Sequence, residues 1–418
     1  MIKLSSFSAV DSRLSKISML LLAMYPLLDW YEIPFTFSLG RTLILFFSAY
    51  IIAYCRFNIN VLPASFLIVL LYVGGAWCTQ HNYELWSLFP PGGWLFFLFY
   101  ISLISGTITL DTRSLQKFMK YIVWLSIVLF WIQYVRVQTT GVNICFVPNL
   151  TGQFTYEDVL YDELVSRHIN SLYPCSIFLE KSYMAYYLAT YLTIVLFGPL
   201  SKDRWWDKEV IIICITLVFL RSGSGIVIMS TIMLIKIFNS FWQNNITRSV
   251  ILITFSLPIL IGAFWTYSSL ESGSEILNRQ SELSTEGTSG YARVVAGYVM
   301  FELQEPSEKM WGTNKHDLAD EYGYNKEGNN VLYINGVQTI LLTLGYVGMA
   351  IYLLFYTLLF RRSTIFGRMS IVVLFIMSLL ESNYLNPYMS LFTIIPCGSL
   401  YHNRFVPQNK FRHVEKIS

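Results

Sequence analysis

Residues 278–293 read NRQSELSTEGTSGYAR and form the centre of the longest polar run in the chain, residues 268–331. Long apolar segments flank this run on both sides. Within it, eleven Asp and Glu residues outnumber five Lys and Arg residues, and Arg279 and Arg293 stand fourteen positions apart. A loop of this length in a compact protein is usually functional or disordered, and we expect a functional one. The alternative is a solvated cap whose arginines pair only with neighbouring glutamates.

The second half of the polar run carries a helical pattern. Apolar side chains recur at Tyr291, Val294, Val295, Tyr298 and Val299. This spacing predicts a helix from residue 291 to residue 303 that lies on a surface.

The composition of the chain is typical of a membrane protein. Its 418 residues are 54% hydrophobic and 13% charged, and the mean hydropathy is +0.50. Average soluble domains carry about 25% charged residues. Apolar runs of about twenty residues, the length of a helix that crosses a bilayer, recur along the chain. The predicted fold class is therefore an all-α polytopic membrane protein, with residues 1–418 forming a single integral membrane domain.

Twelve apolar segments are predicted to be transmembrane helices. The first is expected to be a span and not a signal peptide, because no small-residue cleavage site follows it. Two segments, 208–221 and 368–381, fall short of about twenty residues and are expected to be half-spans or to lie against irregular structure. The expected spans are residues 15–30, 38–55, 61–79, 92–110, 118–137, 174–198, 208–221, 223–239, 249–267, 332–358, 368–381 and 384–402.

Basic residues predict the orientation of these spans. The two termini and alternate loops together hold 19 of the 29 Lys and Arg residues. Cytoplasmic loops carry such an excess, so we expect both termini in the cytoplasm, which requires an even number of spans. The two long loops, 138–173 and 268–331, then face outward and hold 15 of the 26 Asp and Glu residues.

Several function classes lack their usual signals. The sequence has no P-loop, dinucleotide fingerprint or zinc-ligand spacing, so no cofactor and no metal site are predicted. The outward loops are not basic, which argues against nucleic acid as a partner. Cys145 and Cys175 flank the first outward loop and can form a disulfide if that loop is extracytoplasmic. The alternative is that Cys175 already lies in the membrane.

Arg279 and Arg293 are the first candidates for a functional site. A guanidinium group binds phosphate oxygens bidentately and stays charged at any working pH. Two arginines beside a membrane surface can therefore hold the diphosphate of a lipid-linked sugar.

Glu180 and Lys181 lie near the outer end of the sixth expected span. A charged residue inside a span costs about 2.5–3.5 kcal/mol, so such residues usually face a polar cavity or a partner. Adjacent residues point about 100° apart on a helix, so we expect each to have a different partner. Glu180 is either a base or sugar-hydroxyl ligand in a polar cleft, or part of a structural ion pair between helices.

Weaker signals come from a turn and two loop histidines. Arg221 precedes the turn Ser-Gly-Ser-Gly at residues 222–225, and a glycine-rich turn that opens a helix exposes N–H groups to anions. A tight turn between two helices needs glycine as well. His316 stands in the second outward loop, and Arg167 with His168 stands in the first, where a solvated role is the alternative to a functional one.

These motifs together resemble the Wzy-type O-antigen and polysaccharide polymerases and the related O-antigen ligase superfamily. Residues 167–182 (RHINSLYPCSIFLEKS) are similar to the family's stretch of Arg, then Gly-Phe, then Glu-Pro-Ser. Residues 220–225 (LRSGSG) resemble its Arg and Gly turn between spans, and residues 279–293 resemble the paired arginines of its large periplasmic loop. Asn335 followed by Gly345-Tyr-Val-Gly348 resembles its Asn and Gly-x-x-Gly span.

Two departures from the family pattern are informative. In the ligase branch a His precedes the Asn, whereas this chain has Ile334 before Asn335, which favours a polymerase. Lys181 stands where the family has Pro, which weakens the match at Glu180.

The resemblance implies a GT-C-like glycosyltransferase in the bacterial inner membrane that joins undecaprenyl-diphosphate-linked repeat units on the periplasmic face. Membrane lipid and a chain-length-regulating co-polymerase are its implied partners. We assign Arg279, Arg293 and Glu180 to catalysis, and Arg221, Arg167, Lys181, Tyr291, His316 and Asn335 to substrate binding.

Three rival functions remain open at this point. A ligase would transfer a finished chain to lipid A-core. A flippase or transporter of lipid-linked sugars would place its charges deep within many spans, whereas here they gather in outward loops. A receptor or structural membrane protein would not need arginines and carboxylates near one surface.

Overall fold

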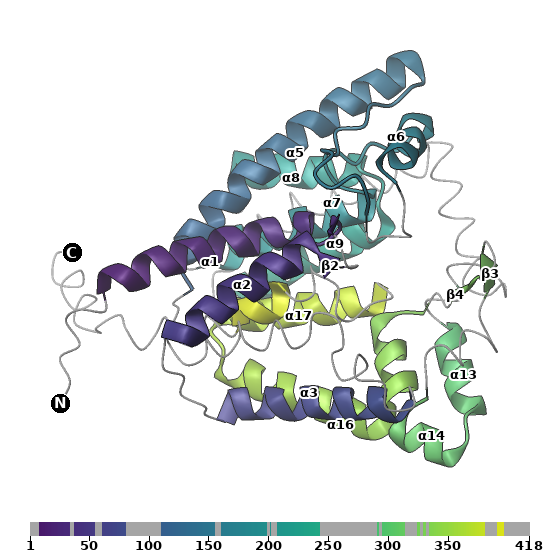
Figure 1. Cartoon of the computed structure of the whole chain (residues 1–418). Helices are drawn as coiled ribbons and strands as arrows, with labels where there is room; N and C mark the ends of the chain where they lie inside the picture. Colours follow the sequence, from purple (N-terminus) through teal and green to yellow (C-terminus); the bar gives the residue numbers. More distant parts are fainter. Residues whose placement is uncertain are drawn as a thin grey trace.

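The computed structural model describes residues 8–33, 37–54, 61–80, 110–154, 160–198, 201, 207–242, 291, 295–313, 324–326, 329–331, 334–380 and 391–396. These residues form a helical protein with two small antiparallel ribbons, β1 (Glu32–Ile33) with β2 (Phe37–Ser38) and β3 (Tyr324–Lys326) with β4 (Asn329–Val331) (Figure 1). The helices are α1 (Ser8–Leu28), α2 (Leu39–Tyr54), α3 (Val61–Gln80), α5 (Thr112–Thr140), α6 (Tyr161–Asn170), α7 (Lys181–Phe197), α8 (Lys208–Phe219), α9 (Gly223–Trp242), α13 (Gly297–Leu303), α14 (Pro306–Trp311), α16 (Gly336–Arg362) and α17 (Ile365–Leu380).

The helix α5 is the longest one described. It begins where the Asp111 carboxylate accepts a hydrogen bond from the N–H of Ser114 and ends at Gly141, whose φ of 69° lies in the left-handed region. One face is buried, but large apolar side chains such as Tyr121 (64% exposed) and Val135 (57% exposed) cover the other face. A helix that is apolar all round is typical of a membrane span.

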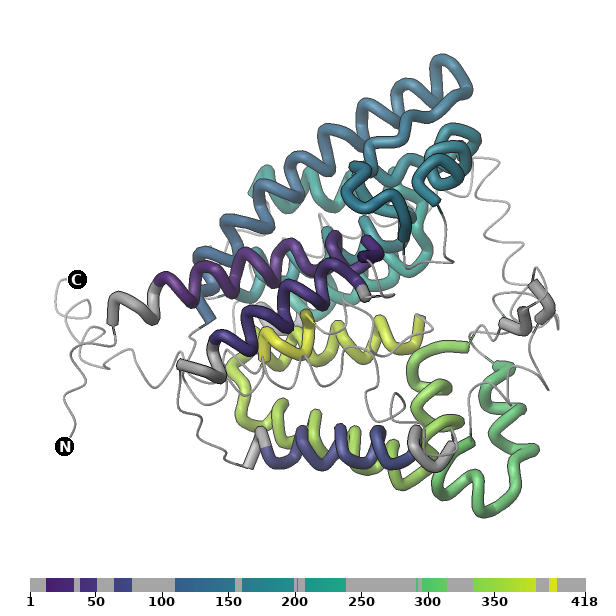
Figure 2. Tube along the Cα trace, viewed as in Figure 1, coloured from purple at the N-terminus to yellow at the C-terminus, as the bar shows by residue number. Residues whose placement is uncertain are grey.

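The helix α7 is the centre of the described bundle. Fourteen of its seventeen residues are buried, on every side of the helix. It packs against α5, α8, α9 and α17, and the hydroxyl of Tyr187 donates to the carbonyl of Ala23 in α1 at 2.9 Å. In Figure 2 the N-terminal helices α1 and α2 lie with this upper group, while α3 lies along α16 below it.

The all-helical prediction is confirmed, whereas the number of spans stays a prediction. By length and composition, α5 and α16 are long and apolar enough to cross a bilayer, and shorter apolar helices occur in α2, α3, α9 and α17. The helix α8, about 18 Å long, is as short as expected for a half-span. The expected spans 92–110 and 249–267, and the twelfth span outside residues 391–396, lie outside the described residues.

Two expected helices differ from the structure. The sixth was expected from residue 174, but α7 begins at Lys181, because residues 171–180 form turns in which Ser176 takes a left-handed φ of 60°. The second is the surface helix expected for residues 291–303. Its regular α-helical part, α13, covers only Gly297–Leu303, and the face that it buries is not the predicted one. Met300 and Phe301 are buried, while Tyr298 and Val299 are exposed.

The helix α16 is broken, although its sequence predicted one continuous span. At Gly345 the backbone has φ 64° and ψ −169°, and Figure 1 shows the two halves running in different directions. The break frees carbonyls that protein groups then satisfy. The N–H of Thr313 donates to the carbonyl of Leu342 at 2.8 Å, and the Tyr72 hydroxyl donates to the carbonyl of Leu344 at 3.0 Å. Irregular backbone at membrane depth is tolerated where the protein satisfies it in this way.

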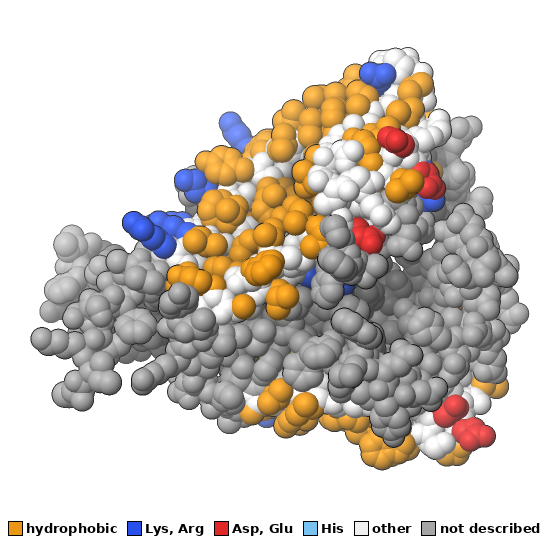
Figure 3. Space-filling view, viewed as in Figure 1, with side chains coloured by type: hydrophobic (Ala, Val, Ile, Leu, Met, Phe, Trp, Pro, Cys, Tyr) orange, Lys and Arg blue, Asp and Glu red, His pale blue; other side chains and the backbone are white. Residues whose placement is uncertain are grey.

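Charge is distributed unevenly over the described surface. In Figure 3, several Lys and Arg side chains lie toward the left of the upper helices, and Asp and Glu side chains lie toward the right, together with other Lys and Arg side chains. Hydrophobic side chains cover much of the helical surface between them.

We predict that Gly345→Ala destabilises the protein by about 2 kcal/mol or more. Its backbone conformation is essentially restricted to glycine and costs other residues about 1–3 kcal/mol. A Cβ there would also lie 2.4 Å from the carbonyl oxygen of Met310, so α14 would have to move.

Gly75→Ala in α3 is the matched control, because a Cβ at that position meets nothing within 4 Å. Alanine favours a helix interior over glycine by about 0.5–1 kcal/mol. Denaturant unfolding of the detergent-solubilised protein measures both variants. Equal stability of the two would contradict the structural role of the break.

Candidate functional site

The predicted site residues fall into two described groups and a remainder. Arg167, Glu180, Lys181 and Arg221 lie near the start of α7 or in the segments packed against it, while Tyr291 and Asn335 lie around α13 and the start of α16. Arg279, Arg293 and His316 lie outside the described residues.

The turn that leads into α7 is clamped by one buried side chain of α5. Gln133 Oε1 accepts hydrogen bonds from the N–H groups of Cys175 and Ser176, at 3.2 Å and 2.7 Å. Its Nε2 donates to the carbonyl of Ile144 at 2.5 Å. A single amide therefore joins α5, the loop 138–173 and the turn before Glu180, and it fixes the backbone that presents Glu180.

His168 supports the same turn from α6. Its buried ring lies with Nε2 3.0 Å from the carbonyl oxygen of Leu179 and with Nδ1 3.6 Å from the sulfur of Cys175. A carbonyl only accepts, so Nε2 carries the proton. Burial lowers the pKa of His168 from its usual value, although the Leu179 carbonyl and the nearby Glu180 act in the other direction. The histidine is therefore neutral in the fold at physiological pH.

Glu180 and Lys181 have different neighbours, as their adjacent positions predicted. Glu180 stands at the N-cap of α7 with an extended backbone, and the Ser182 hydroxyl donates to its Oε2 at 3.1 Å. The Lys181 ammonium lies 3.9 Å from the centre of the Tyr173 ring. Arg167 pairs with Glu163 at 2.7 Å on the surface of α6, a contact of the kind that contributes about 0.3–0.5 kcal/mol.

The Arg221 turn packs directly against the first turns of α7. Arg221 itself has a left-handed φ of 53°. The hydroxyls of Ser222 and Ser224 lie 3.1 Å apart at the start of α9. A Cβ on Gly225 would come within 2.6 Å of the Cβ of Ala185, so only glycine allows α9 to approach α7 this closely. The structure therefore brings the N-termini of α7 and α9 together, each beside a basic residue.

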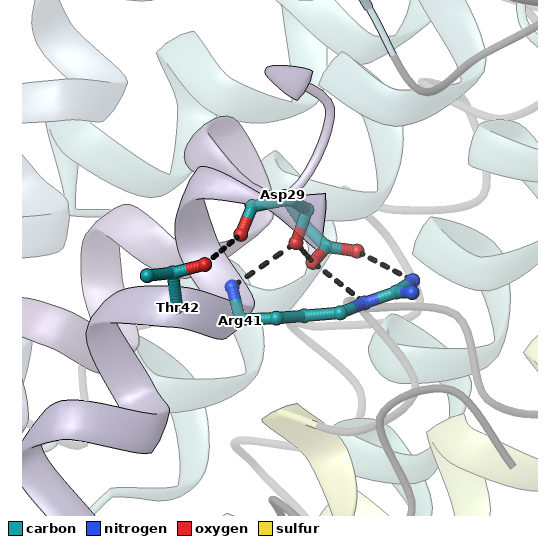
Figure 4. A network of polar contacts seen from close by, with 4 residues as sticks. Asp29, Arg41 and Thr42 are labelled. Carbon is teal, nitrogen blue, oxygen red and sulfur yellow. Dashed lines mark hydrogen bonds and ion pairs between the residues drawn. The ribbon is translucent and has the colours of Figure 1, made fainter. Parts of the chain in front are cut away.

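The sequence did not single out a third component, the hairpin between α1 and α2. Asp29, which is 2% exposed, forms an ion pair with Arg41 (Figure 4). Nε of Arg41 lies 3.1 Å from Oδ1 of Asp29, and Nη2 of Arg41 lies 3.2 Å from Oδ2. The Ser38 hydroxyl donates to the same carboxylate at 2.6 Å. The sequence does place Asp29 and Arg41, which carry opposite charges, at the ends of two neighbouring apolar runs. Whether these two side chains pair depends on the turn between the runs, which the sequence did not predict.

This hairpin is attached to both α7 and the loop 138–173. The Trp30 ring stacks on Tyr183, in the first turn of α7, with centroids 4.6 Å apart. The ring of the next residue, Tyr31, packs on Phe154 with centroids 5.1 Å apart. The Tyr31 hydroxyl donates to the carbonyl of Pro148 at 2.9 Å. The hairpin, the loop and α7 therefore form one unit around Glu180.

The second group is built around the N-terminus of α16. Asn335 caps this helix by accepting from the N–H of Gln338 at 2.8 Å, and Gln338 returns the contact to the N–H of Asn335. Tyr291 packs against a small apolar cluster that contains Ile334 and Phe301. The Asn of the predicted motif thus has a structural role in the described structure.

The described residues bear on two further predictions. Cys145 and Cys175 are free thiols, so the disulfide that the sequence left open is not formed. Among the described ranges, no group of three or more His, Cys, Asp or Glu side chains could hold a metal ion.

Comparison with known proteins identifies a family. Residues 29–397, most of the chain, match the sequence model of the family described as WcaD colanic acid polymerase. No curated protein matches the chain.

We predict that His168 makes the stability of this unit depend on pH. Because the fold keeps the ring neutral, its contribution is complete above the ordinary histidine pKa of about 6.5 and is lost as the pH falls below it. His168→Gln keeps a donor for the Leu179 carbonyl but cannot titrate.

Thermal unfolding of the detergent-solubilised protein between about pH 7.5 and about pH 5.5 tests this prediction. The wild type should lose more stability on acidification than His168→Gln. Parallel losses in the two proteins would assign the pH dependence to other groups.

Proposed function

The chain belongs to the WcaD colanic acid polymerase family, and we propose that it acts on repeat units carried by undecaprenyl diphosphate at the periplasmic face of the bacterial inner membrane. Family membership makes it a Wzy-type polysaccharide polymerase. It is thus a glycosyltransferase that joins lipid-linked repeat units into surface polysaccharide.

The proposed membrane arrangement has twelve spans, both termini in the cytoplasm and two large periplasmic loops, residues 138–173 and 268–331. The distribution of basic residues along the sequence supports it. So does the position of the acidic side chains of the upper helices, which lie toward one end of the described surface (Figure 3). In this arrangement the start of α7, the α1–α2 hairpin and the Arg221 turn all face the periplasm.

The reaction is a displacement at an anomeric carbon. The growing chain on its lipid diphosphate is the donor, and a hydroxyl of a single lipid-linked repeat unit is the acceptor. The new C–O bond forms as the bond to the diphosphate breaks, and the electron pair leaves with the diphosphate. The protein therefore has to position two substrates and stabilise the departing anion.

The observation that carries this proposal is the contact between Gly225 of α9 and Ala185 of α7. It holds two helix N-termini side by side, with Lys181 at one and Arg221 at the other. Helix N-termini present free N–H groups and a partial positive charge, and they bind phosphate readily. We assign the leaving diphosphate to this place.

The remaining assignments follow the family resemblance. Arg279 and Arg293 would complete the diphosphate site from the second periplasmic loop, with Glu180 as a candidate base. Arg167, Tyr291, His316 and Asn335 would contact the sugars. A chain-length-regulating co-polymerase is the expected protein partner, and lipid tails would enter between spans.

We predict that Arg221→Gln and Arg293→Gln each slow polymerisation about a hundredfold or more, the usual cost of losing one anion-stabilising donor. Arg136→Gln is the matched control, because Arg136 is an exposed basic residue at the outer end of α5. The variants are expressed in a strain that lacks the native gene. Secreted polysaccharide and lipopolysaccharide are then analysed for amount and chain length.

The products of the deletion strain identify the polymer. Shortened or missing secreted polysaccharide indicates a colanic-acid-like product, and a lipopolysaccharide with one repeat unit on its core indicates O-antigen. Lipopolysaccharide without any repeat unit would point to a ligase or flippase. Wild-type polymer from both arginine variants, at normal protein levels, would show that the diphosphate site is assigned wrongly.

A further inference from the structure

The hairpin between α1 and α2 carries a carboxylate oxygen, Oε2 of Glu32, for which the described protein provides no hydrogen-bond donor. Glu32 is partly exposed, but its Oε2 is shielded from solvent and accepts no hydrogen bond from the described part of the chain. An unsatisfied, desolvated acceptor costs about 1–3 kcal/mol, and more when it is charged. Such a group calls for an explanation, and a catalytic or ligand-binding role is one of them.

The backbone of Glu32 is fixed on both sides. Its N–H donates to the carbonyl of Gln153 at 3.1 Å, and the residue pairs with Ser38 in the β1–β2 ribbon. The buried Asp29–Arg41 ion pair secures the two helices on which this ribbon stands. The carboxylate is therefore held in place before any substrate binds, which is the condition for efficient catalysis.

Glu32 also belongs to the hairpin that meets α7. Trp30 lies in the turn before the β1–β2 ribbon, and the backbone of Tyr31 pairs with that of Phe154 in the loop 138–173. Trp30 stacks on Tyr183, in the first turn of α7, whereas Tyr31 packs on the first outward loop. Glu32 therefore belongs to the same assembly as Glu180 and Lys181.

Comparison of the two carboxylates favours Glu32 as a proton acceptor. Glu180 already accepts a hydrogen bond from Ser182 at 3.1 Å. The Oε2 of Glu32 has no donor among the residues that the structure describes. A general base must reach the proton that it removes, so an acceptor with an unfilled position on a rigid element suits this role better.

We propose that Glu32 binds the acceptor hydroxyl and takes its proton, an inference that rests on the proposed polymerase reaction. The hydroxyl oxygen forms the new bond to the anomeric carbon of the donor sugar. Its proton passes to the Glu32 carboxylate, and the diphosphate leaves with the electron pair of the broken bond. The protonated carboxyl then returns its proton to water.

The experiment compares Glu32→Gln with Glu180→Gln and Glu302→Gln in the purified, detergent-solubilised protein. The substrate is the lipid-linked repeat unit extracted from a strain without polymerase. Glu302 is the control, because it is an exposed carboxylate in α13 and pairs with Lys309 on the surface. Polymer formation gives the rate, and substrate-induced thermal stabilisation gives the binding.

We expect Glu32→Gln to lose about 10²–10⁴ in rate while it still binds the repeat unit, the range typical of a lost general base. Glu180→Gln should lose less, and Glu302→Gln should match the wild type. Glu32→Asp keeps the carboxylate but withdraws it by one methylene, so its rate should lie between those of the wild type and Glu32→Gln.

Two outcomes would overturn the assignment. One is a wild-type rate in both Glu32→Gln and Glu32→Asp. The other is a loss in Glu32→Gln that disappears once its reduced binding or folding is corrected. Both leave the polymerase function intact, because the wild type still forms polymer. A wild-type protein that forms no polymer from this substrate would instead overturn the proposed function.

Discussion

The complete burial of α7 is the constraint on which the rest of the structure depends. A helix enclosed on every side has no face left for solvent or lipid, so each neighbouring helix must be placed to cover part of it. The Tyr187 hydroxyl, itself buried, is satisfied only because α1 brings the carbonyl of Ala23 to it. Small residues set the closest approach, as Ala185 does with Gly225 of α9. Once α7 is enclosed, only its ends remain available for chemistry.

The N-terminal end of α7 is held by polar contacts that replace a regular helical start. Residues 171–180 do not continue the helix, and their N–H groups need other partners. Gln133 supplies one acceptor to two of them, and His168 binds the Leu179 carbonyl. These contacts fix the backbone of the turn before Glu180, as helical hydrogen bonds fix the backbone after it. A site that places two large substrates needs such rigid support.

The sequence predicted the helices well because apolar length is a local property. The described helices α2, α3 and α9 begin within a residue of the expected spans. The site was only partly predictable, since Arg221 and Glu180 carried local signals, whereas the stack of Trp30 on Tyr183 joins residues far apart in the chain. Glu32 gave no signal at all, because an unfilled acceptor is recognisable only when its surroundings are known. The start of α7 was missed for a similar reason, since Gln133 replaces the helical hydrogen bonds of that turn.

The break in α16 explains how the segment that contains α13 and α14 is attached to the other helices. Gly312 and Gly345, both with left-handed φ, allow the end of α14 and the break in α16 to touch backbone to backbone. The Thr313 N–H then donates a hydrogen bond to the Leu342 carbonyl, which the break leaves without its helical donor. The contact between α14 and α16 therefore satisfies a backbone group that the break exposes. Backbone hydrogen bonds of this kind do not depend on salt or pH as surface ion pairs do. The end of α14 is therefore fixed to α16 by the same feature that makes α16 irregular, and Gly345, the first glycine of the Gly-x-x-Gly pattern, makes that contact.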